Sequence, residues 1–238
     1  MSKLFIVPTP VGNLEDITLR AIRALKECDL ILAEDTRQTK KLLDHFQIQK
    51  QLLSYHKFNE YKTVESVVER ITSGATVALV SDGGTPGISD PGHILIAACI
   101  KAGIAVECLP GPTAFVPALV NSGFGTDEFA FIGFLPHKKG RQTKLKEVAA
   151  IDKTVLLYES PFRVLKLLEE LKLHIGPERK ISCSREISKM FEETVRGTAD
   201  ELIAHFTKKE PRGEFVVVIE NRAENKEPRG KTIDNTQN

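Results

Sequence analysis

The amino-acid sequence predicts an α/β protein of two domains, the first built on a mainly parallel sheet and the second on a mixed sheet. Short apolar runs alternate with segments of helical periodicity along almost the whole chain, as expected of strands that are followed by helices. A turn-rich break, LPGPTA at 109–114, divides the 238 residues near their middle. We therefore expect domains over residues 1–111 and 112–221, followed by a polar, disordered tail over 222–238.

The first half contains four short apolar runs that predict strands, at residues 4–7, 29–33, 76–80 and 105–109. Apolar residues spaced three and four apart predict helices between them, at 17–28, about 37–46 and around 64–71. A further helix is expected before the last of these strands, capped by Asp90, with Pro91 in its first position and Gly103 at its end.

The second half begins with a predicted helix at 113–122 and has five runs that predict strands, at 129–134, 154–158, 179–184, 192–197 and 214–220. Ser160 and Pro161 are expected to open a helix after the second of these strands. Thr198 and Glu201 match a capping box, which predicts a short helix before the last strand.

Composition limits the classes of function. The formal net charge is +1, so binding to nucleic acid has to come from a local patch. The four cysteines form no C-x-x-C pair, and we interpret them as small buried hydrophobic residues of a cytoplasmic protein. No apolar run reaches the roughly 18 residues of a membrane span. The six histidines lack the spacing of a zinc site, so we predict no metal.

The segment SDGGTPGISDPG, residues 81–92, follows a predicted buried strand and contains four glycines. In open α/β sheets, ligands bind beyond the carboxyl ends of the strands, and glycines allow a ligand to lie against the backbone. The spacing fits neither a P-loop nor a dinucleotide fingerprint. No Lys or Arg lies between Ile71 and Ile100, so a sulfonium or ammonium group suits this loop better than a polyphosphate. A tight structural turn explains the same residues equally well.

Further segments can be taken together with this loop: VPTPVGNLEDIT, AEDTR, LPGPTA, GFLP, YESPFR, REI and RGEFVVVIE. In this order they closely resemble the ribosomal RNA small subunit methyltransferase I family, in the tetrapyrrole-methylase-like class of S-adenosylmethionine-dependent enzymes. The resemblance runs from about residue 3 to 221. It implies a two-domain fold with the cofactor between the domains, a homodimer, and 2′-O-methylation of a cytidine ribose in 16S ribosomal RNA.

The resemblance also implies a set of cofactor contacts in the glycine loop, the first motif, the LPGPTA segment and the second domain. These residues are Pro10, Asp82, Gly83, Gly84, Thr85, Pro86, Ile88, Thr113, Ala114 and Ile187. Turn geometry is an alternative explanation for Pro10 and Pro86, and helix capping for Thr113. Longer relatives continue with an extra helical segment after the last strand, so RNA contacts made there are not carried over to this chain.

Methyl transfer to a hydroxyl needs a group that accepts or orients its proton. Glu34 or Asp35 is the expected group, with Glu159 as a further candidate, and Arg37 is expected to bind a backbone phosphate. The simpler alternative is that Asp35 or Thr36 caps the next helix, with Asp35 favoured, and that Arg37 is a solvated surface residue. His56 is a weaker candidate for a base or an RNA contact.

A basic segment over 137–146 has no acidic residue and carries Lys138, Lys139, Arg141, Lys144 and Lys146. Such a run can neutralise RNA phosphates, although a solvated helix face is the common alternative. Two rival functions stay open. One is a methyltransferase of the same class that acts on a small molecule or a protein residue, and the other is an RNA-binding protein without catalytic activity.

Overall fold

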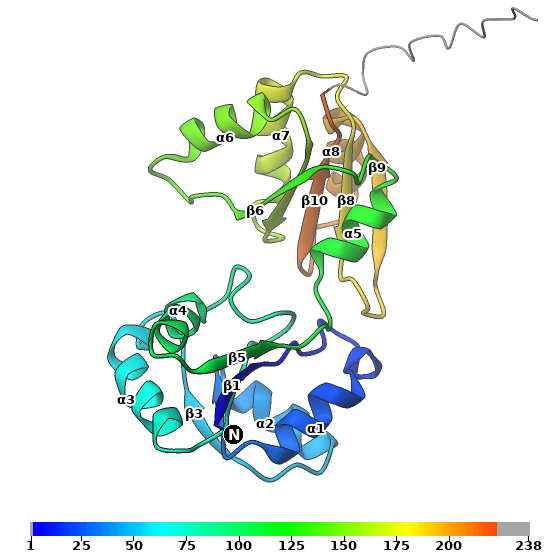
Figure 1. Ribbon diagram of the computed structural model, residues 1–238. Coiled ribbons are helices and arrows are strands. Elements are labelled where there is room, and N and C mark those ends of the chain that lie inside the picture. Colours follow the sequence, from blue (N-terminus) through cyan, green and yellow to red (C-terminus); the bar gives the residue numbers. More distant parts are fainter. Residues whose placement is uncertain (1, 223–238) are drawn as a thin grey trace, which may run out of the picture. The chain divides into compact units, whose positions relative to one another are not determined.

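The computed structural model describes residues 2–222. The chain divides into two compact units, and the second begins at Phe115 (Figure 1). Each unit contains one five-stranded sheet. Apart from Arg222, the tail that the sequence predicts to be disordered lies outside the described residues. Within residues 2–222, no helix combines the length and the apolar character that crossing a membrane requires.

The first unit is built on a parallel sheet with the strand order β3-β2-β4-β1-β5. Its strands are β1 (Lys3–Ile6), β2 (Leu30–Ala33), β3 (Gln51–Ser54), β4 (Val77–Val80) and β5 (Ala105–Cys108). Its helices are the 3-10 turn η1 (Leu14–Asp16), α1 (Leu19–Glu27), α2 (Thr36–His45), α3 (Glu60–Thr72) and α4 (His93–Lys101). The central strands β2 and β4 are buried at every position, as expected when helices cover both faces of a parallel sheet.

Successive side chains of a strand point to opposite faces of the sheet, so the apolar core of the first unit forms two layers, one on each face. Phe5 of β1 packs on the side of α1 and α2, with Leu25 and Leu43. Leu4 packs on the opposite side with Ile71 of α3 and with residues of α4. Figure 1 shows these two pairs of helices on opposite faces of the sheet. The sheet is thus covered on both faces, and its carboxyl edge is left for loops.

The second unit has a mixed sheet with the order β6-β7-β10-β8-β9, in which only the β6–β7 pair is parallel. Its strands are β6 (Phe129–Phe134), β7 (Thr154–Glu159), β8 (Ile181–Arg185), β9 (Glu193–Gly197) and β10 (Phe215–Ile219). Its helices are α5 (Phe115–Ser122), α6 (Arg141–Ala150), α7 (Val164–Ile175) and α8 (Ala199–Thr207). Helices α6, α7 and α8 share one apolar core with the sheet, and α5 packs on β8, β9 and β10. The predicted α/β class is confirmed for both units.

Two predicted helix starts are wrong, whereas the third is confirmed. Helix α4 is capped by Gly92 and begins at His93, so Asp90 and Pro91 belong to the preceding loop. Position 92 requires a glycine, because its φ is +144° and a Cβ there would lie only 2.9 Å from Cδ2 of Leu79. Helix α7 begins at Val164, later than the predicted Ser160-Pro161 start. The capping box that opens α8 is present as predicted.

Two further details differ from the sequence-based expectation. Strand β3 was not predicted, because QLLS contributes only two apolar residues and lies at the sheet edge. Three of the cysteines, Cys28, Cys99 and Cys183, are buried as interpreted, but Cys108 is exposed. Burial raises the pKa of the Cys28 and Cys99 thiols to about 11, so these groups stay protonated near neutral pH.

Candidate active site

The carboxyl edge of the first unit's sheet brings together segments that are far apart in the sequence. All five strands are parallel, so the residues that follow them emerge at the same edge. His56 comes after β3, Glu34 after β2, Asp82 after β4 and Pro10 after β1. This edge therefore brings together the predicted site residues Glu34, Asp82 and Pro10 with His56, the weaker candidate for a base.

The glycine loop is joined to the first motif by a backbone bridge. The Gly84 amide donates to the carbonyl of Thr9 at 2.8 Å, and the Thr9 amide donates back at 2.9 Å. The Thr9 hydroxyl also donates to the carbonyl of Ser81 at 2.9 Å. Gly84 has a φ of +91°, a conformation that residues with a side chain rarely adopt. The bridge therefore explains this glycine by local structure.

The LPGPTA segment packs against both the glycine loop and the first motif. The Thr85 hydroxyl donates to the carbonyl of Pro112 at 3.1 Å. A Cβ at Gly111 would lie only 2.7 Å from Cβ of Pro8. The three motifs that the sequence singled out thus form one layer of closely packed backbone. The other predicted contacts from this unit, Thr85, Pro86, Ile88, Thr113 and Ala114, lie in these same loops.

Gly83 differs from Gly84 because its backbone does not require a glycine. Its φ is not positive, and a Cβ there would lie 3.2 Å from the carbonyl oxygen of Pro10, slightly closer than an ordinary contact. Within residues 2–222, the Gly83 amide donates to no other group. This N–H is available to a ligand that carries a carboxylate.

The carboxylate of Asp35 caps the N-terminus of α2. Its Oδ1 accepts from the Arg37 amide at 2.9 Å, and its Oδ2 pairs with the Arg37 guanidinium at 2.6 Å. These bonds lower the pKa of Asp35 to about 2. The Arg37 side chain is 86% exposed. The simpler of the two sequence-based alternatives is therefore present in the structure, and it leaves Asp35 a weak base.

Glu34 has the opposite electrostatic environment. Burial raises the pKa of Glu34 above its usual value, and the nearby charge of Asp82 raises it further. The Asp82 amide and His56 act in the other direction without cancelling this effect. Desolvation also raises the pKa of Asp82, whose Oδ1 accepts from the Asp35 amide at 3.0 Å. Because a raised pKa makes a carboxylate a stronger base, Glu34 is better suited than Asp35 to accept a proton.

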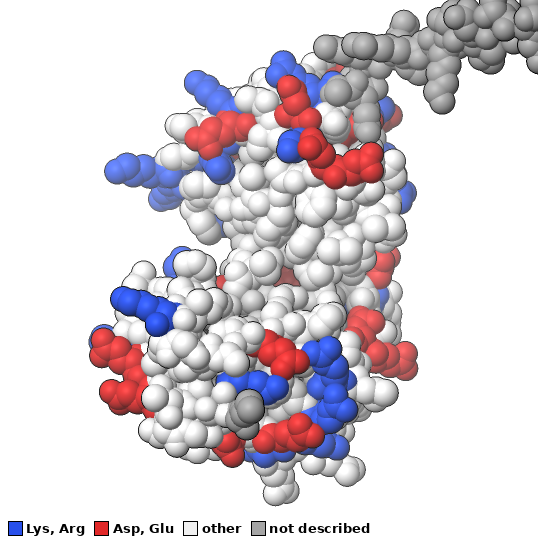
Figure 2. Space-filling view, viewed as in Figure 1, with Lys and Arg blue, Asp and Glu red and all other residues white. Residues whose placement is uncertain are grey.

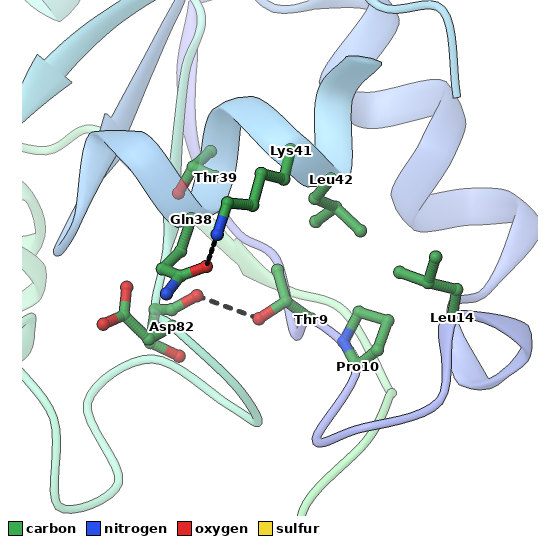
Figure 3. Close-up of a pocket in the computed structure, with 9 residues that line it drawn as sticks. Thr9, Pro10, Leu14, Gln38, Thr39, Lys41, Leu42 and Asp82 are labelled. Atoms are coloured by element: carbon green, nitrogen blue, oxygen red, sulfur yellow. Dashed lines mark hydrogen bonds between the residues drawn. The ribbon is translucent and has the colours of Figure 1, made fainter. Parts of the chain in front are cut away.

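A pocket of about 210 Å³ opens beside this cluster, between the first motif and α2. Its lining residues are Thr9, Pro10, Leu14, Gln38, Thr39, Lys41, Leu42, Ser81 and Asp82. Figure 3 shows Pro10, Leu14 and Leu42 together at one end. Gln38 and Asp82 lie at the other end, and Lys41 donates to the Gln38 side chain at 3.2 Å. The pocket therefore combines apolar walls with a few polar groups, as small-molecule sites do.

The predicted catalytic and cofactor-binding residues of the second unit, Glu159 and Ile187, are much less accessible. Glu159 is 2% exposed, and its Oε1 accepts from the Ser160 amide at 2.8 Å and from the Arg163 guanidinium at 2.7 Å. Ile187 is 7% exposed and lies between two residues with positive φ, Glu186 and Ser188. Such strained backbone persists only where its surroundings hold it, and it is concentrated at functional sites.

The basic segment contains residues of two kinds. Lys138 and Lys139 are exposed, and Figure 2 shows basic side chains projecting where the chain leads into α6. Arg141 is only 3% exposed and pairs with Glu170 at 2.7 Å. Its guanidinium also lies 3.6 Å from Glu159 and donates to the carbonyl of Pro136. We therefore withdraw Arg141 from the RNA-binding set, because its charge is neutralised inside the protein.

Lys144 is partly exposed and pairs with Glu147 at 2.9 Å, on the surface of α6. Elsewhere on the face that Figure 2 shows, Lys and Arg are interspersed with Asp and Glu. This mixture agrees with the formal net charge of +1. Contact with RNA phosphates would therefore depend on a few local lysines.

Comparison with known proteins identifies the family. The family described as Tetrapyrrole (Corrin/Porphyrin) Methylases matches residues 3–203. A uroporphyrin-III C-methyltransferase from Thermus thermophilus, solved in complex with S-adenosylhomocysteine, has a similar fold. Its TM-score is 0.64 at 21% identity, over 92% of this chain and 97% of that one. The family match covers most of the chain and agrees with the fold, so the chain belongs to the tetrapyrrole methylase family.

Closer relatives identify the branch. A Synechocystis protein called ribosomal RNA small subunit methyltransferase I is 47% identical over 92% of this chain and 79% of its own length. A Thermotoga maritima protein of the same name is 45% identical over 92% of this chain and 98% of its own length. The chain belongs to the ribosomal RNA small subunit methyltransferase I family, as the resemblance of its motifs indicated.

Proposed function

We propose that this protein transfers a methyl group from S-adenosylmethionine to the 2′-hydroxyl of a cytidine ribose in 16S ribosomal RNA. The observation that carries the proposal is the 47% identity, over 92% of the chain, to a relative named for methylation of small-subunit ribosomal RNA. The grouping of Glu34, Asp82 and the glycine loop at one sheet edge supports it, since a methyl acceptor and a methyl donor must meet at one place.

The residues of the edge fit S-adenosylmethionine chemically. The Gly83 amide can donate to the carboxylate of the amino acid moiety, and the side chain of Ile88, 40% exposed, offers an apolar contact. Asp82 supplies a negative charge for the ammonium or sulfonium group. When bound, S-adenosylmethionine supplies a methyl group that its sulfonium makes electrophilic. We keep the other predicted contacts, including Ile187, as part of the proposal.

Glu34 is the proposed proton acceptor. Its half-buried carboxylate takes the proton of the ribose hydroxyl as the oxygen becomes a nucleophile, and its raised pKa makes that transfer easier. Asp35 holds the start of α2 and orients Arg37, whose exposed guanidinium binds a backbone phosphate. We assign no proton transfer to Glu159, because both the Arg163 and Arg141 guanidinium groups lie beside it and it is buried.

Lys138, Lys139 and Lys144 are the proposed phosphate contacts of the second unit. We also propose that the protein is a cytoplasmic homodimer, because the family resemblance implies a dimer and ribosomes are the source of the substrate. Sedimentation velocity at micromolar concentration tests the dimer, and a single species with the mass of one chain would contradict it.

Methyl-transfer assays test the function directly. The protein is incubated with tritium-labelled S-adenosylmethionine and one of three acceptors: small ribosomal subunits, naked 16S RNA, or uroporphyrinogen III. We expect label in the RNA of at least one ribosomal acceptor and none in the tetrapyrrole. Label in the tetrapyrrole alone would favour the small-molecule alternative. Absence of label in every acceptor, together with no binding of S-adenosylhomocysteine in a calorimetric titration, would favour a protein without catalytic activity.

A further inference from the structure

Two exposed aromatic side chains follow β3, Phe58 in the connecting turn and Tyr61 in the first turn of α3. Phe58 is 91% exposed and Tyr61 is 75% exposed. Two more exposed residues of this segment, Lys57 and Lys62, have no ion pair within residues 2–222. We call residues 56–62 the aromatic turn. A single exposed ring is common on a protein surface, but exposed apolar side chains that gather in one short segment can mark an interaction site.

The aromatic turn is held in place by Asn59. The Asn59 side chain accepts from the His56 amide at 2.8 Å and donates to the carbonyl of Ser54 at 3.0 Å. The Phe58 amide donates to Nδ1 of His56 at 3.2 Å, and the two rings meet edge to face with centroids 6.0 Å apart. These bonds fix the backbone that presents the rings, which lowers the entropy cost of binding.

The turn emerges beside the proposed catalytic carboxylate. Ser54 pairs with Ala33, the residue directly before Glu34, in the parallel β2–β3 ladder. The Tyr55 amide continues the ladder by donating to the carbonyl of Ala33 at 2.8 Å. The aromatic turn therefore begins at the same level of the sheet edge as Glu34. A polymer that presents one of its groups to Glu34 would extend along this edge.

The chemistry of the turn matches single-stranded RNA. Aromatic rings stack on unpaired bases, and neighbouring ammonium groups pair with the phosphates between them. The core of a protein–protein interface is instead depleted of lysine. We propose that Phe58 and Tyr61 form a stacking platform for unpaired bases next to the methylated nucleotide, with Lys57 and Lys62 on the adjoining phosphates. This inference rests on the proposed RNA substrate.

Binding of a fluorescein-labelled, single-stranded oligocytidine of about ten nucleotides, a length within the range of known single-strand sites, tests the platform. Fluorescence anisotropy is measured for the full chain and for Phe58→Leu, Phe58→Tyr and Tyr61→Leu. We expect each leucine variant to bind about 5- to 150-fold more weakly, because stacking on one base is worth about 1–3 kcal/mol. Phe58→Tyr keeps an aromatic ring and is expected to bind like the unaltered protein.

Methylation of small ribosomal subunits gives the second readout. For Phe58→Leu we expect a raised KM for the subunits with kcat and the affinity for S-adenosylhomocysteine unchanged. Leu173→Ala, which removes another apolar side chain that is 83% exposed, is the matched control and should change nothing.

Leucine variants that bind and methylate RNA normally would overturn the platform while the proposed function stands. A shift in their oligomeric state with unchanged RNA affinity would instead make the turn a protein contact. If the unaltered protein neither binds nor methylates RNA, the proposed function fails, and the platform fails with it.

Discussion

Replacing Gly83 by alanine separates the two reasons for a glycine in the loop after β4. If the glycine serves only local packing, the cost appears in stability; if it admits the cofactor, the cost appears in binding. The backbone at Gly83 accepts an alanine, since its φ is not positive. The new Cβ would lie 3.2 Å from the Pro10 oxygen and 3.5 Å from Cα of Val11. A movement of a few tenths of an ångström relieves the closer contact.

We expect Gly83→Ala to lower the free energy of unfolding by about 1 kcal/mol or less, the low end of overpacking costs. Gly111→Ala is the matched control, because its Cβ would meet Cβ of Pro8 at 2.7 Å and Cγ at 3.0 Å. Two ring atoms at such distances require a real shift of backbone, so we expect about 1–3 kcal/mol there. Urea unfolding measures both values. Gly84 is unsuitable for this comparison, since its φ of +91° makes any side chain strained.

The measurement that decides whether this loop binds the cofactor is the calorimetric titration of Gly83→Ala with S-adenosylhomocysteine. A methyl group placed where the ligand contacts the loop backbone should weaken binding at least tenfold, about 1.4 kcal/mol, in a protein that unfolds almost normally. Unchanged affinity would refute the assignment of this loop to the cofactor. It would leave the glycine as a feature of chain packing, as the bridge between Thr9 and Gly84 already is for its neighbour.

Three further substitutions test the assigned roles. Glu34→Gln should lower kcat by about 10²- to 10⁴-fold without changing the affinity for S-adenosylhomocysteine, and a variant with normal kcat would exclude Glu34 as the base. In the unaltered protein, the acid limb of the pH–rate profile should have its midpoint above 4.5, because the pKa of Glu34 is raised. Lys138→Ala with Lys139→Ala should reduce the slope of log affinity for RNA against log salt by about one to two, with stability unchanged, and an unaltered slope would argue against phosphate contact. Arg141→Ala should lower the free energy of unfolding in urea by about 3–5 kcal/mol, because it removes the ion-pair partner of the largely buried Glu170 and one of the two guanidinium groups beside Glu159; a near-neutral effect would contradict the buried ion pair.

The sequence predicted those features that depend on local pattern. Continuous apolar runs at β2 and β4 indicate buried parallel strands, and the Thr198 capping box depends only on residues three apart. Because parallel strands end at the same edge of a sheet, the residues that follow β2 and β4, Glu34 and Asp82 among them, lie at one edge. Strand β3 lies at the sheet edge and is only half apolar, so its pattern is weak. Without β3, the position of His56 beside Glu34 was not predictable.

Features that depend on distant partners were out of reach of sequence patterns. Arg141 belongs to a basic run that is typical of a solvated surface, but Glu170 and Glu159 neutralise it from other elements. The expected cap at Asp90 is wrong because Gly92 caps α4, and a glycine is needed there because a Cβ would lie 2.9 Å from Leu79, a residue that is distant in the sequence. The choice between Glu34 and Asp35 also needed the structure, since both carboxylates follow the same strand. The bonds of Asp35 to Arg37 distinguish that carboxylate, and burial with the nearby charge of Asp82 distinguishes Glu34.

The most direct test is nucleoside mass spectrometry of 16S ribosomal RNA from cells in which the gene is deleted and then restored. We predict that one 2′-O-methylated cytidine disappears on deletion, returns with the unaltered gene and does not return with Glu34→Gln. The same cytidine methylated at full level in the deletion strain would contradict the proposed function.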